Sequence, residues 1–392
     1  MSDAILVINA GSSSLKFAVF SIDGDDLALA QTGIVDNLLG AATFAARNAG
    51  GAPLAKRAFA VGELDAHDGA IEFLLDYLGK SNDGTTLAAV GHRVVHGGER
   101  YVAPVRLTPA IVDDLARLSP LAPLHQPHNL APIRIFAKRA PGVPQVACFD
   151  TAFHATAPAI AQAFALPREL SDAGIRRYGF HGLSYEFIAE RLRDIDGAAA
   201  AGRVVVAHLG NGASMCAMVE GRSVATTMGL TALDGLVMGT RTGSIDPGVL
   251  LYLMRERGMD EPALSELLYK RSGLLGVSGV SSDMRALEAS DDANAAAAID
   301  LFCYRAVREI GSLAAAMGGI DALVFTAGIG EHAAPVRGKI VLALAWLGFA
   351  LEEAANAQNA LRIAPHDGKP VYAIPTDEER MIARHTRGII SA

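Results

Sequence analysis

The sequence predicts an α/β protein made of two domains with duplicated topology. Short apolar runs alternate with longer stretches of helical spacing along the 392 residues, a pattern typical of sheets covered by helices. A strand–turn–strand pattern over residues 5–17 occurs again over residues 204–216, about half the chain later. At about 150 residues per domain, a chain of this length divides into two or three compact units.

Apolar runs predict strands at residues 5–9, 15–20, 87–95, 144–149, 203–208, 214–219, 323–326 and 371–374. Helices are predicted from their first residues and their spacing. Thr108 and Asp246 each precede a proline, which indicates an N-cap before the first helical position. Residues 71–78 keep the i, i+3, i+4, i+7 spacing of an apolar helix face. Near the carboxyl end, Thr376 and Glu379 fit a capping box in which Glu379 reaches back to Thr376.

The repeated pattern places a polar residue and a tight turn between two apolar strands. Asn9 and Gly11 occupy these places in the first copy, and His208 and Gly210 in the second. One such turn per domain would present backbone N–H groups to the two sides of a phosphate chain. Two ordinary hairpins are the alternative interpretation. A third glycine turn, at residues 323–332, follows an apolar strand and opens a helical pattern, but it is not a dinucleotide-binding fingerprint.

Charge and hydropathy exclude several classes of function. Asp and Glu number 42 against 34 Lys and Arg, so the net charge of −8 argues against nucleic acid or an acidic membrane as partner. The longest uncharged run, residues 151–167, is too short for a membrane-spanning helix. The first residues carry no basic region or cleavage site, which predicts a cytoplasmic protein. The cysteines lie far apart in apolar stretches and are predicted to be buried free thiols.

The segment from Val90 to Gly98 carries a cation that is suited to a small acid. In an extended strand, Arg93 and Val95 share one face, so a positive charge lies beside a small apolar wall. This pair suits an acid with a short hydrocarbon tail, while an ion pair between Arg93 and a surface carboxylate is the alternative. His92 and His96 would lie roughly 13 Å apart in such a strand, too far to share one metal ion.

Two further carboxylates are candidates for the site. Asp150 ends an apolar strand, where an α/β sheet usually presents a ligand-facing carboxylate, although it is equally suited to cap the following turn. Glu378 has no part in the predicted capping box, so it is the freer carboxylate for a hard cation such as Mg²⁺. The segments 177–182 and 239–243 frame charged or ionisable side chains with glycines, which permits close approach to a ligand. His125, His128 and His154 are predicted to be structural.

Taken together, these segments resemble the acetate kinase family, which belongs with sugar kinases, the Hsp70 ATPase and actin in one superfamily. The resemblance runs through nearly the whole chain. It rests on Asn9-Ala-Gly-Ser-Ser-Ser-Leu-Lys16, Gly91-His-Arg93, Phe149-Asp-Thr-Ala-Phe-His154, Arg177-Tyr-Gly-Phe-His-Gly182, His208-Leu-Gly-Asn-Gly212, Met238-Gly-Thr-Arg-Thr-Gly243, Phe325-Thr-Ala-Gly-Ile-Gly-Glu331 and Thr376-Asp-Glu-Glu379. It implies two α/β domains of duplicated ribonuclease H-like (actin-like ATPase) topology around a central cleft. The expected domains are 1–149 with 377–392 for acyl substrate and Mg²⁺, and 150–376 for nucleotide.

The resemblance also implies a reaction, its cofactors and its partners. The expected activity is reversible phosphoryl transfer from ATP to acetate, giving acetyl phosphate and ADP in a cytoplasmic homodimer. Mg²⁺ is the expected metal, with Mn²⁺ as an alternative. A propionate or butyrate kinase, or a nucleotide-driven switch without kinase activity, are the competing interpretations. Arg93, Arg241 and His181 favour a kinase, since a pure switch does not need them.

Carried over position by position, the resemblance implies a role for each matching residue. Asn9 and Glu378 would hold the metal, and Arg93 would bind the acyl substrate. Asp150, His181 and Arg241 would be catalytic. The nucleotide site would comprise Lys16, His208, Leu209, Gly210, Asn211, Gly212, Asp283, Met284, Arg285, Gly328, Ile329, Gly330, Glu331 and His332.

The sequence departs from the family in the expected acyl pocket. Val95, Leu124, Phe180 and Ala232 would be its walls, and Ala232 stands where family members commonly have proline. A smaller wall leaves room for one more methylene, worth up to about 0.8 kcal/mol when buried, so we expect propionate to be accepted along with acetate. Tyr185 replaces a common family histidine, and Gln126 and Asp377 replace common asparagines.

Overall fold

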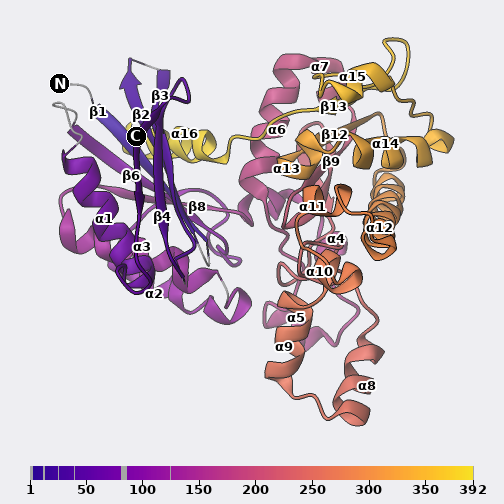
Figure 1. Cartoon of the computed structure of the whole chain (residues 1–392), viewed down its shortest axis with the longest axis horizontal. Coiled ribbons are helices and arrows are strands. Elements are labelled where there is room, and N and C mark those ends of the chain that lie inside the picture. The colour runs from indigo at the N-terminus through magenta and orange to yellow at the C-terminus, as the bar shows by residue number, and fades with distance from the viewer. Residues whose placement is uncertain are drawn as a thin grey trace. The chain divides into compact units, whose positions relative to one another are not determined.

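The computed structural model describes residues 3–11, 14–24, 26–38, 40–80, 86–123 and 125–391. The chain forms two compact units (Figure 1). The first unit comprises Met1–Ala152 together with Asp377–Ala392, and the second comprises Phe153–Thr376. None of the helices in the described ranges has both the length and the apolar character that a membrane crossing requires.

The first unit is built on an eight-stranded sheet of order β5-β4-β3-β2-β1-β6-β8-β7. Its strands are β1 (Asp3–Ala10), β2 (Leu15–Asp23), β3 (Asp26–Asp36), β4 (Thr43–Asn48), β5 (Pro53–Ala58), β6 (Thr86–Val94), β7 (Val105–Arg106) and β8 (Gln145–Phe149). Its helices are α1 (Ala66–Lys80), α2 (Pro109–Ala116), η1 (Ser119–Leu121), α3 (Gln126–Arg139) and α16 (Glu378–Ser391). The short helix η2 (Ala152–Thr156) begins at the last residue of this unit.

The alternation of side chains along β1 and β6 decides which helix covers which face of this sheet. Leu6 and Val90 point into an apolar core shared with Ile71 of α1 and Phe136 of α3. The opposite face is covered by α16. A Cβ on Gly91 would lie 2.3 Å from Thr386 Oγ1, so glycine permits the close packing of α16 on β6. Residues of β6 that share a face with Gly91 therefore lie toward α16.

The second unit has a five-stranded sheet of order β11-β10-β9-β12-β13. Its strands are β9 (Arg203–Leu209), β10 (Ala213–Val219), β11 (Arg222–Thr226), β12 (Ala322–Thr326) and β13 (Val371–Ala373). Its helices are α4 (Ala159–Gln162), α5 (Arg168–Asp172), α6 (Gly182–Ile195), α7 (Gly197–Ala200), α8 (Pro247–Arg257), α9 (Glu261–Lys270), α10 (Gly273–Ser278), α11 (Met284–Glu288), α12 (Ala293–Met317), α13 (Ala327–His332), α14 (Ala334–Ala343), η3 (Ala345–Leu347) and α15 (Glu353–Ala357). Ile188 and Leu192 of α6 pack against Val204 and Val206 of β9.

The predicted duplication of topology is confirmed. In each unit an antiparallel hairpin, β1–β2 or β9–β10, is followed by two parallel strands beside its first strand. The sheet order β3-β2-β1-β6-β8 in the first unit thus matches β11-β10-β9-β12-β13 in the second. Two unrelated hairpins would not share this continuation.

All eight predicted strands are present, with ends that differ by up to three residues. The helices predicted after Thr108 and Asp246 are also present, and both cap side chains accept a backbone N–H hydrogen bond. Strands β3, β4, β5, β7 and β11 were not predicted. Most of them alternate polar and apolar residues and are partly exposed, so a search for continuous apolar runs misses them.

Candidate active site

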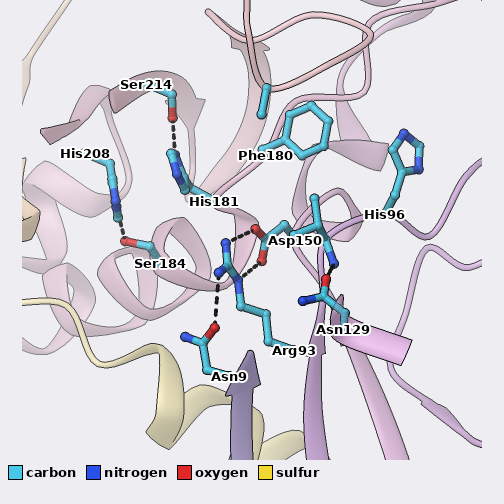
Figure 2. A network of polar contacts seen from close by, with 12 residues as sticks. Asn9, Arg93, His96, Asn129, Asp150, Phe180, His181, Ser184, His208 and Ser214 are labelled. Atoms are coloured by element: carbon cyan, nitrogen blue, oxygen red, sulfur yellow. Dashed lines mark hydrogen bonds and ion pairs between the residues drawn. The ribbon is translucent and has the colours of Figure 1, made fainter. Parts of the chain in front are cut away.

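The guanidinium of Arg93 is held by a buried carboxylate of the neighbouring strand. Arg93 shares the face of Gly91, and its Nε and Nη2 donate to Asp150 Oδ1 and Oδ2 over 3.0 and 2.5 Å (Figure 2). The Asp150 side chain is 2% exposed and that of Arg93 18%. The expected alternative of a surface ion pair for Arg93 is therefore wrong, because its partner is buried.

Asn9, at the end of β1, completes this arrangement. Its Oδ1 accepts from Arg93 Nη1 over 3.2 Å, and its Nδ2 lies 3.5 Å from Glu379 Oε1. A guanidinium has five N–H donors, and three of those of Arg93 are engaged by Asp150 and Asn9. Among the residues that the structure describes, one donor on Nη1 and one on Nη2 remain for a further anion.

The first turn of α16 brings two more carboxylates, Glu378 and Glu379, to this cation. Burial raises the pKa of Glu378 to about 7, opposed by the charge of Arg93 and reinforced by that of Asp150. Burial alone would lower the pKa of Arg93, but the charge and hydrogen bonds of Asp150 raise it, as does Glu378. The arrangement therefore holds more negative charge than its cations balance, a condition that favours binding of a further cation.

The predicted capping box at Thr376 is wrong. Helix α16 begins at Glu378, and it is Asp377 Oδ1 that accepts from the backbone N–H of Arg380 over 2.9 Å. The N–H of Thr376 is bound instead by Glu331 Oε1 of the same unit, at 3.2 Å. Asp377, one residue after the predicted cap, thus accepts the hydrogen bond of a free N–H group in the first turn of α16. The Glu379 side chain takes no part in capping and lies near Asn9 instead.

In the second unit, His181 and His208 stack with ring centroids 4.2 Å apart and planes 13° from parallel. His181 Nδ1 lies 2.8 Å from Ser214 Oγ, and His208 Nδ1 lies 2.8 Å from Ser184 Oγ (Figure 2). Helical spacing explains this cluster, since Ser184 and Tyr185 lie three and four residues after His181 on the sheet-facing side of α6.

The predicted glycine turns are built by close backbone contacts. The N–H of Gly239 donates to the carbonyl of Asn211 over 2.9 Å, and a Cβ on Gly239 would lie 1.8 Å from Asn211 Oδ1. A side chain at this position would displace that of Asn211, so glycine permits the segment 239–243 to pack closely against the β9–β10 turn. Arg241 of this segment donates to the carbonyl of Ala232 over 2.9 Å.

The other expected nucleotide residues lie at helix starts. Gly328, Ile329, Gly330, Glu331 and His332 belong to α13, which starts directly after β12 as the sequence predicts. Asp283 caps α11 and pairs with Arg285 at 2.6 Å, and Met284 is buried. Sequence reasoning missed the fully buried Arg337, whose Nη1 donates to the carbonyl of Gly330 over 2.9 Å.

Several expected site residues are not brought together within one unit. Val95 is buried in the first unit, whereas Phe180 and Ala232 belong to the second. Leu124 lies outside the described residues. Lys16 of β2 is exposed and its charge lowers the pKa of Glu378. His154 is structural as expected, because its ring nitrogens lie 2.9 Å from Ser223 Oγ and from the carbonyl of Phe180.

Sequence reasoning also missed the serines that hold the two histidines. Ser184 and Ser214 are fully buried and contact the rings directly. A serine hydroxyl is neutral and common, so neither composition nor spacing distinguishes a serine of this kind from any other. The signal available was their position, because Ser184 lies three residues after the glycine-framed His181 and Ser214 lies two residues after Gly212 of the glycine turn.

Comparison with known proteins gives a consistent result. Residues 4–384 match the family described as the Acetokinase family. An acetate kinase of Rhodopseudomonas palustris is 54% identical over 98% of both chains, and one of Rhizobium meliloti is 52% identical over 100% of this chain and 99% of its own. Among solved structures, a propionate kinase from Francisella tularensis has a TM-score of 0.92 at 37% identity, covering 99% of this chain and 100% of its own. Porphyromonas gingivalis acetate kinase gives 0.87 at 37% identity, with the same coverage.

The raised pKa of Glu378 predicts how stability depends on pH in metal-free protein. The protonated Glu378 carboxyl has a pKa of about 7 in the folded state and about 4.5 in the unfolded chain. Its contribution to the free energy of unfolding is therefore fully present below pH 4.5 and is lost as the pH rises through 7. Glu378→Gln removes the dependence. When the pH is raised from about 5 to about 8, we expect the free energy of unfolding of the wild type to fall by about 2 kcal/mol more than that of the variant. Thermal unfolding of both proteins in EDTA measures this, and an offset in Tm that is the same at both pH values would contradict it.

Proposed function

The chain belongs to the acetokinase family, and we propose that it transfers the terminal phosphoryl group of ATP reversibly to acetate, giving acetyl phosphate and ADP in the cytoplasm. The observation that carries the proposal is the Arg93 guanidinium, fixed on one edge by Asp150 while two N–H donors remain. A small carboxylate is the anion that such a pair of donors suits.

The chemistry explains why positive charge is needed. The reaction brings a carboxylate against a phosphate, and the transferred group spreads its charge over three equatorial oxygens. At neutral pH the acid is already ionised, so no base has to remove a proton from it. Positioning and positive charge must therefore supply most of the catalysis. We assign the acid to Arg93, the phosphate chain to Lys16, and the transferred group to Arg241 and His181.

Asp150 acts in this proposal by holding Arg93. Both of its oxygens already accept hydrogen bonds from the guanidinium, which fits an organising carboxylate better than one that abstracts a proton. The buried pair keeps the guanidinium plane in a fixed orientation, and with it the direction of the two remaining donors.

The donor set of the first unit fits a hard divalent cation, for which we propose Mg²⁺. Asn9 and Glu378 supply oxygen ligands, and the surplus of carboxylates around Arg93 favours added positive charge. Within the described residues no group of three or more His, Cys, Asp or Glu side chains would hold a metal by itself. Mg²⁺ commonly completes its shell with water and substrate phosphates, and when bound it neutralises phosphate charge.

The nucleotide is assigned to the second unit. We assign the phosphates to its glycine-containing β9–β10 turn (Leu209 to Gly212) and to the start of α13, where a Cβ on Gly328 would meet nothing within 4 Å. Asp283, Met284 and Arg285 are assigned to the remainder of the nucleotide. Asp283 is the N-cap residue of α11. Its carboxylate accepts hydrogen bonds from the backbone N–H and from the guanidinium of Arg285, which keeps the Arg285 side chain at the start of this helix.

A propionate kinase is the second candidate. Ala232 is smaller than the proline that members of the family commonly have at this position, and the chain is similar in structure to a propionate kinase. One added methylene that is buried beside Ala232 would contribute up to about 0.8 kcal/mol. Both acids are therefore expected to serve as substrates.

We also propose that the active form is a homodimer joined through α8. The apolar run from Val249 to Met254 fills half of this helix, yet none of the eleven residues of α8 is buried. Other exposed apolar side chains in the second unit are Ile245, Val277, Val280 and Tyr304. An apolar helix without a buried face indicates an interaction surface, and a second copy of the chain is the proposed occupant.

An assay with a series of acids tests the function. ADP release and acyl phosphate, trapped with hydroxylamine, are measured with formate, acetate, propionate and butyrate. Acetate and propionate should both support turnover, and Ala232→Pro should shift the preference toward acetate by up to about fourfold. Arg93→Ala should raise the KM for the acid and lower kcat at least about 100-fold. The control Arg57→Ala removes an exposed ion pair and two cation–π contacts outside the proposed site, and should leave both constants unchanged. ADP release that no acid accelerates would contradict the proposal and favour a nucleotide switch.

Asp150→Asn tests the organising role of this carboxylate. Asparagine presents an NH₂ group to Arg93 where an oxygen now accepts, so we expect kcat to fall at least about 100-fold with no recovery at high pH. The apparent affinity for Mg²⁺ should fall in parallel. The control Asp114→Asn alters a carboxylate paired with the exposed Arg100 and should leave kcat unchanged. A loss with unchanged Mg²⁺ dependence would count against the assignment.

Sedimentation analysis tests the dimer. The wild-type chain should sediment as a dimer, and Leu251→Glu, which places a charge on exposed apolar surface of α8, should give monomers. The control Leu54→Glu adds the same charge at an exposed leucine of the first unit and should remain dimeric. Dimers with both variants would exclude α8 as the interface.

A further inference from the structure

A buried tyrosine hydroxyl lies behind the His181 side chain. Tyr185 Oη is 2.5 Å from Ser214 Oγ, and the same Oγ is 2.8 Å from His181 Nδ1. Tyr185 and Ser214 are both fully buried. The three side chains form one continuous hydrogen-bonded series, in which the serine hydroxyl lies between the phenol and the imidazole.

The other ring nitrogen of His181 faces the predicted phosphate-binding turn. A Cβ built on Gly212 would lie 3.5 Å from His181 Nε2, so this nitrogen lies beside the backbone of the β9–β10 turn. The ring is also held from one side, because it stacks on His208, whose Nδ1 is in turn held by Ser184. Ser184 contacts Thr376 Oγ1 over 2.9 Å.

The direction of the hydrogen bonds decides which nitrogen of the neutral ring carries the proton. Tyrosine and serine hydroxyls have one hydrogen each, and a phenol is a stronger acid than an alcohol. The phenol is therefore the better donor to Ser214 Oγ. When Tyr185 donates, the buried Ser214 hydroxyl satisfies its own single hydrogen by donating it to His181 Nδ1, so Nδ1 accepts and the ring proton resides on Nε2.

We infer that Tyr185 is a positioning residue that fixes the Nε2–H tautomer of His181. The imidazole then offers an N–H donor toward the β9–β10 turn as a neutral ring. This inference rests on the proposed function only in taking the transferred phosphoryl group as the acceptor of that N–H. A serine alone would not fix the tautomer, since its hydroxyl can rotate either to donate to Nδ1 or to accept from it.

The hydroxyl of Tyr185 can be separated from its packing. The ring packs against Phe153, His154 and His208, with centroids 6.4, 5.5 and 6.3 Å away. Tyr185→Phe keeps these ring contacts and removes only the oxygen. Tyr372→Phe is a matched control in the same unit, because it removes another buried hydroxyl, one that lies 2.7 Å from Asp196 and outside the proposed site.

Nitrogen NMR of protein labelled with ¹⁵N-histidine reports the tautomer directly. Spectra are taken at about pH 8, and a neutral ring is recognised by one protonated and one unprotonated nitrogen signal. His181→Gln identifies the signals. In wild type and in Tyr372→Phe we expect Nε2 to carry the proton, and in Tyr185→Phe we expect both tautomers to be populated.

Kinetics supply the second readout. Tyr185→Phe should lower kcat about tenfold with the KM for the acid unchanged, because the N–H donor is then present in only part of the molecules. Tyr185→His, which restores a ring N–H donor, should recover at least part of that loss. Tyr372→Phe should keep the wild-type kcat.

Two outcomes would overturn the inference. One is a wild-type spectrum with the proton on His181 Nδ1, and the other is a Tyr185→Phe variant with an unchanged tautomer. The spectra do not depend on turnover, so a wild-type protein with the Nε2–H tautomer but without acid-dependent ADP release would contradict the proposed function and not the inference.

Discussion

The ion pair between Arg93 and Asp150 is the interaction on which the first unit's polar site depends. Arg93 belongs to β6, and Asp150 directly follows β8. Asn9 of β1 accepts a hydrogen bond from Arg93, and Glu378 and Glu379 of α16 interact with its charge, so residues from four elements meet at this ion pair. Removing two charges from water costs several kcal/mol per ion, and the bidentate geometry offsets this cost. Removing Arg93 would leave the buried carboxylate of Asp150 without its cation, and removing Asp150 would take away two of the three hydrogen bonds that hold the guanidinium. The orientation of the remaining donors of Arg93 therefore depends on Asp150.

The duplicated topology gives both units a polar residue at the same place, with different chemistry. Asn9 is the penultimate residue of β1 and His208 that of β9, so they occupy equivalent positions of the two hairpins. Around Asn9 the groups are ionic, with Arg93 balanced against several carboxylates. Around His208 they are imidazoles and hydroxyls, with Ser184 bonded to His208 and Tyr185 bonded to Ser214. One fold thus supports one site built from ionised groups and another built from imidazoles and hydroxyls.

The sequence predicted the elements whose residues are apolar without interruption, and missed those that are half exposed. Strands β1, β9 and β12 are buried along nearly their whole length, so their composition alone identifies them. Arg93 and Asp150 were each singled out, but they are 57 residues apart, and only strand pairing brings them together. The cap of α16 was misplaced by one residue because Asp377 and Thr376 are both good N-cap residues. Local preference does not decide between two such neighbours when a distant carboxylate, here that of Glu331, takes the N–H of one of them.

Two of the four non-glycine residues with a positive φ angle in the described part of the second unit lie in the proposed site, whereas Glu220 and Asn359 lie outside it. His181 and Ala327 have positive φ angles of 58° and 64°, and each stands at the start of a helix, α6 or α13. A left-handed conformation costs a residue with a Cβ about 1 kcal/mol or more, and alanine has no polar side chain to compensate. Neither helix has a side-chain hydrogen bond at its N-cap residue. Folding alone would favour glycine at both positions. At position 181, however, glycine would remove the ring that contacts Ser214 and His208, so the strain follows from placing an imidazole at a turn too tight for it.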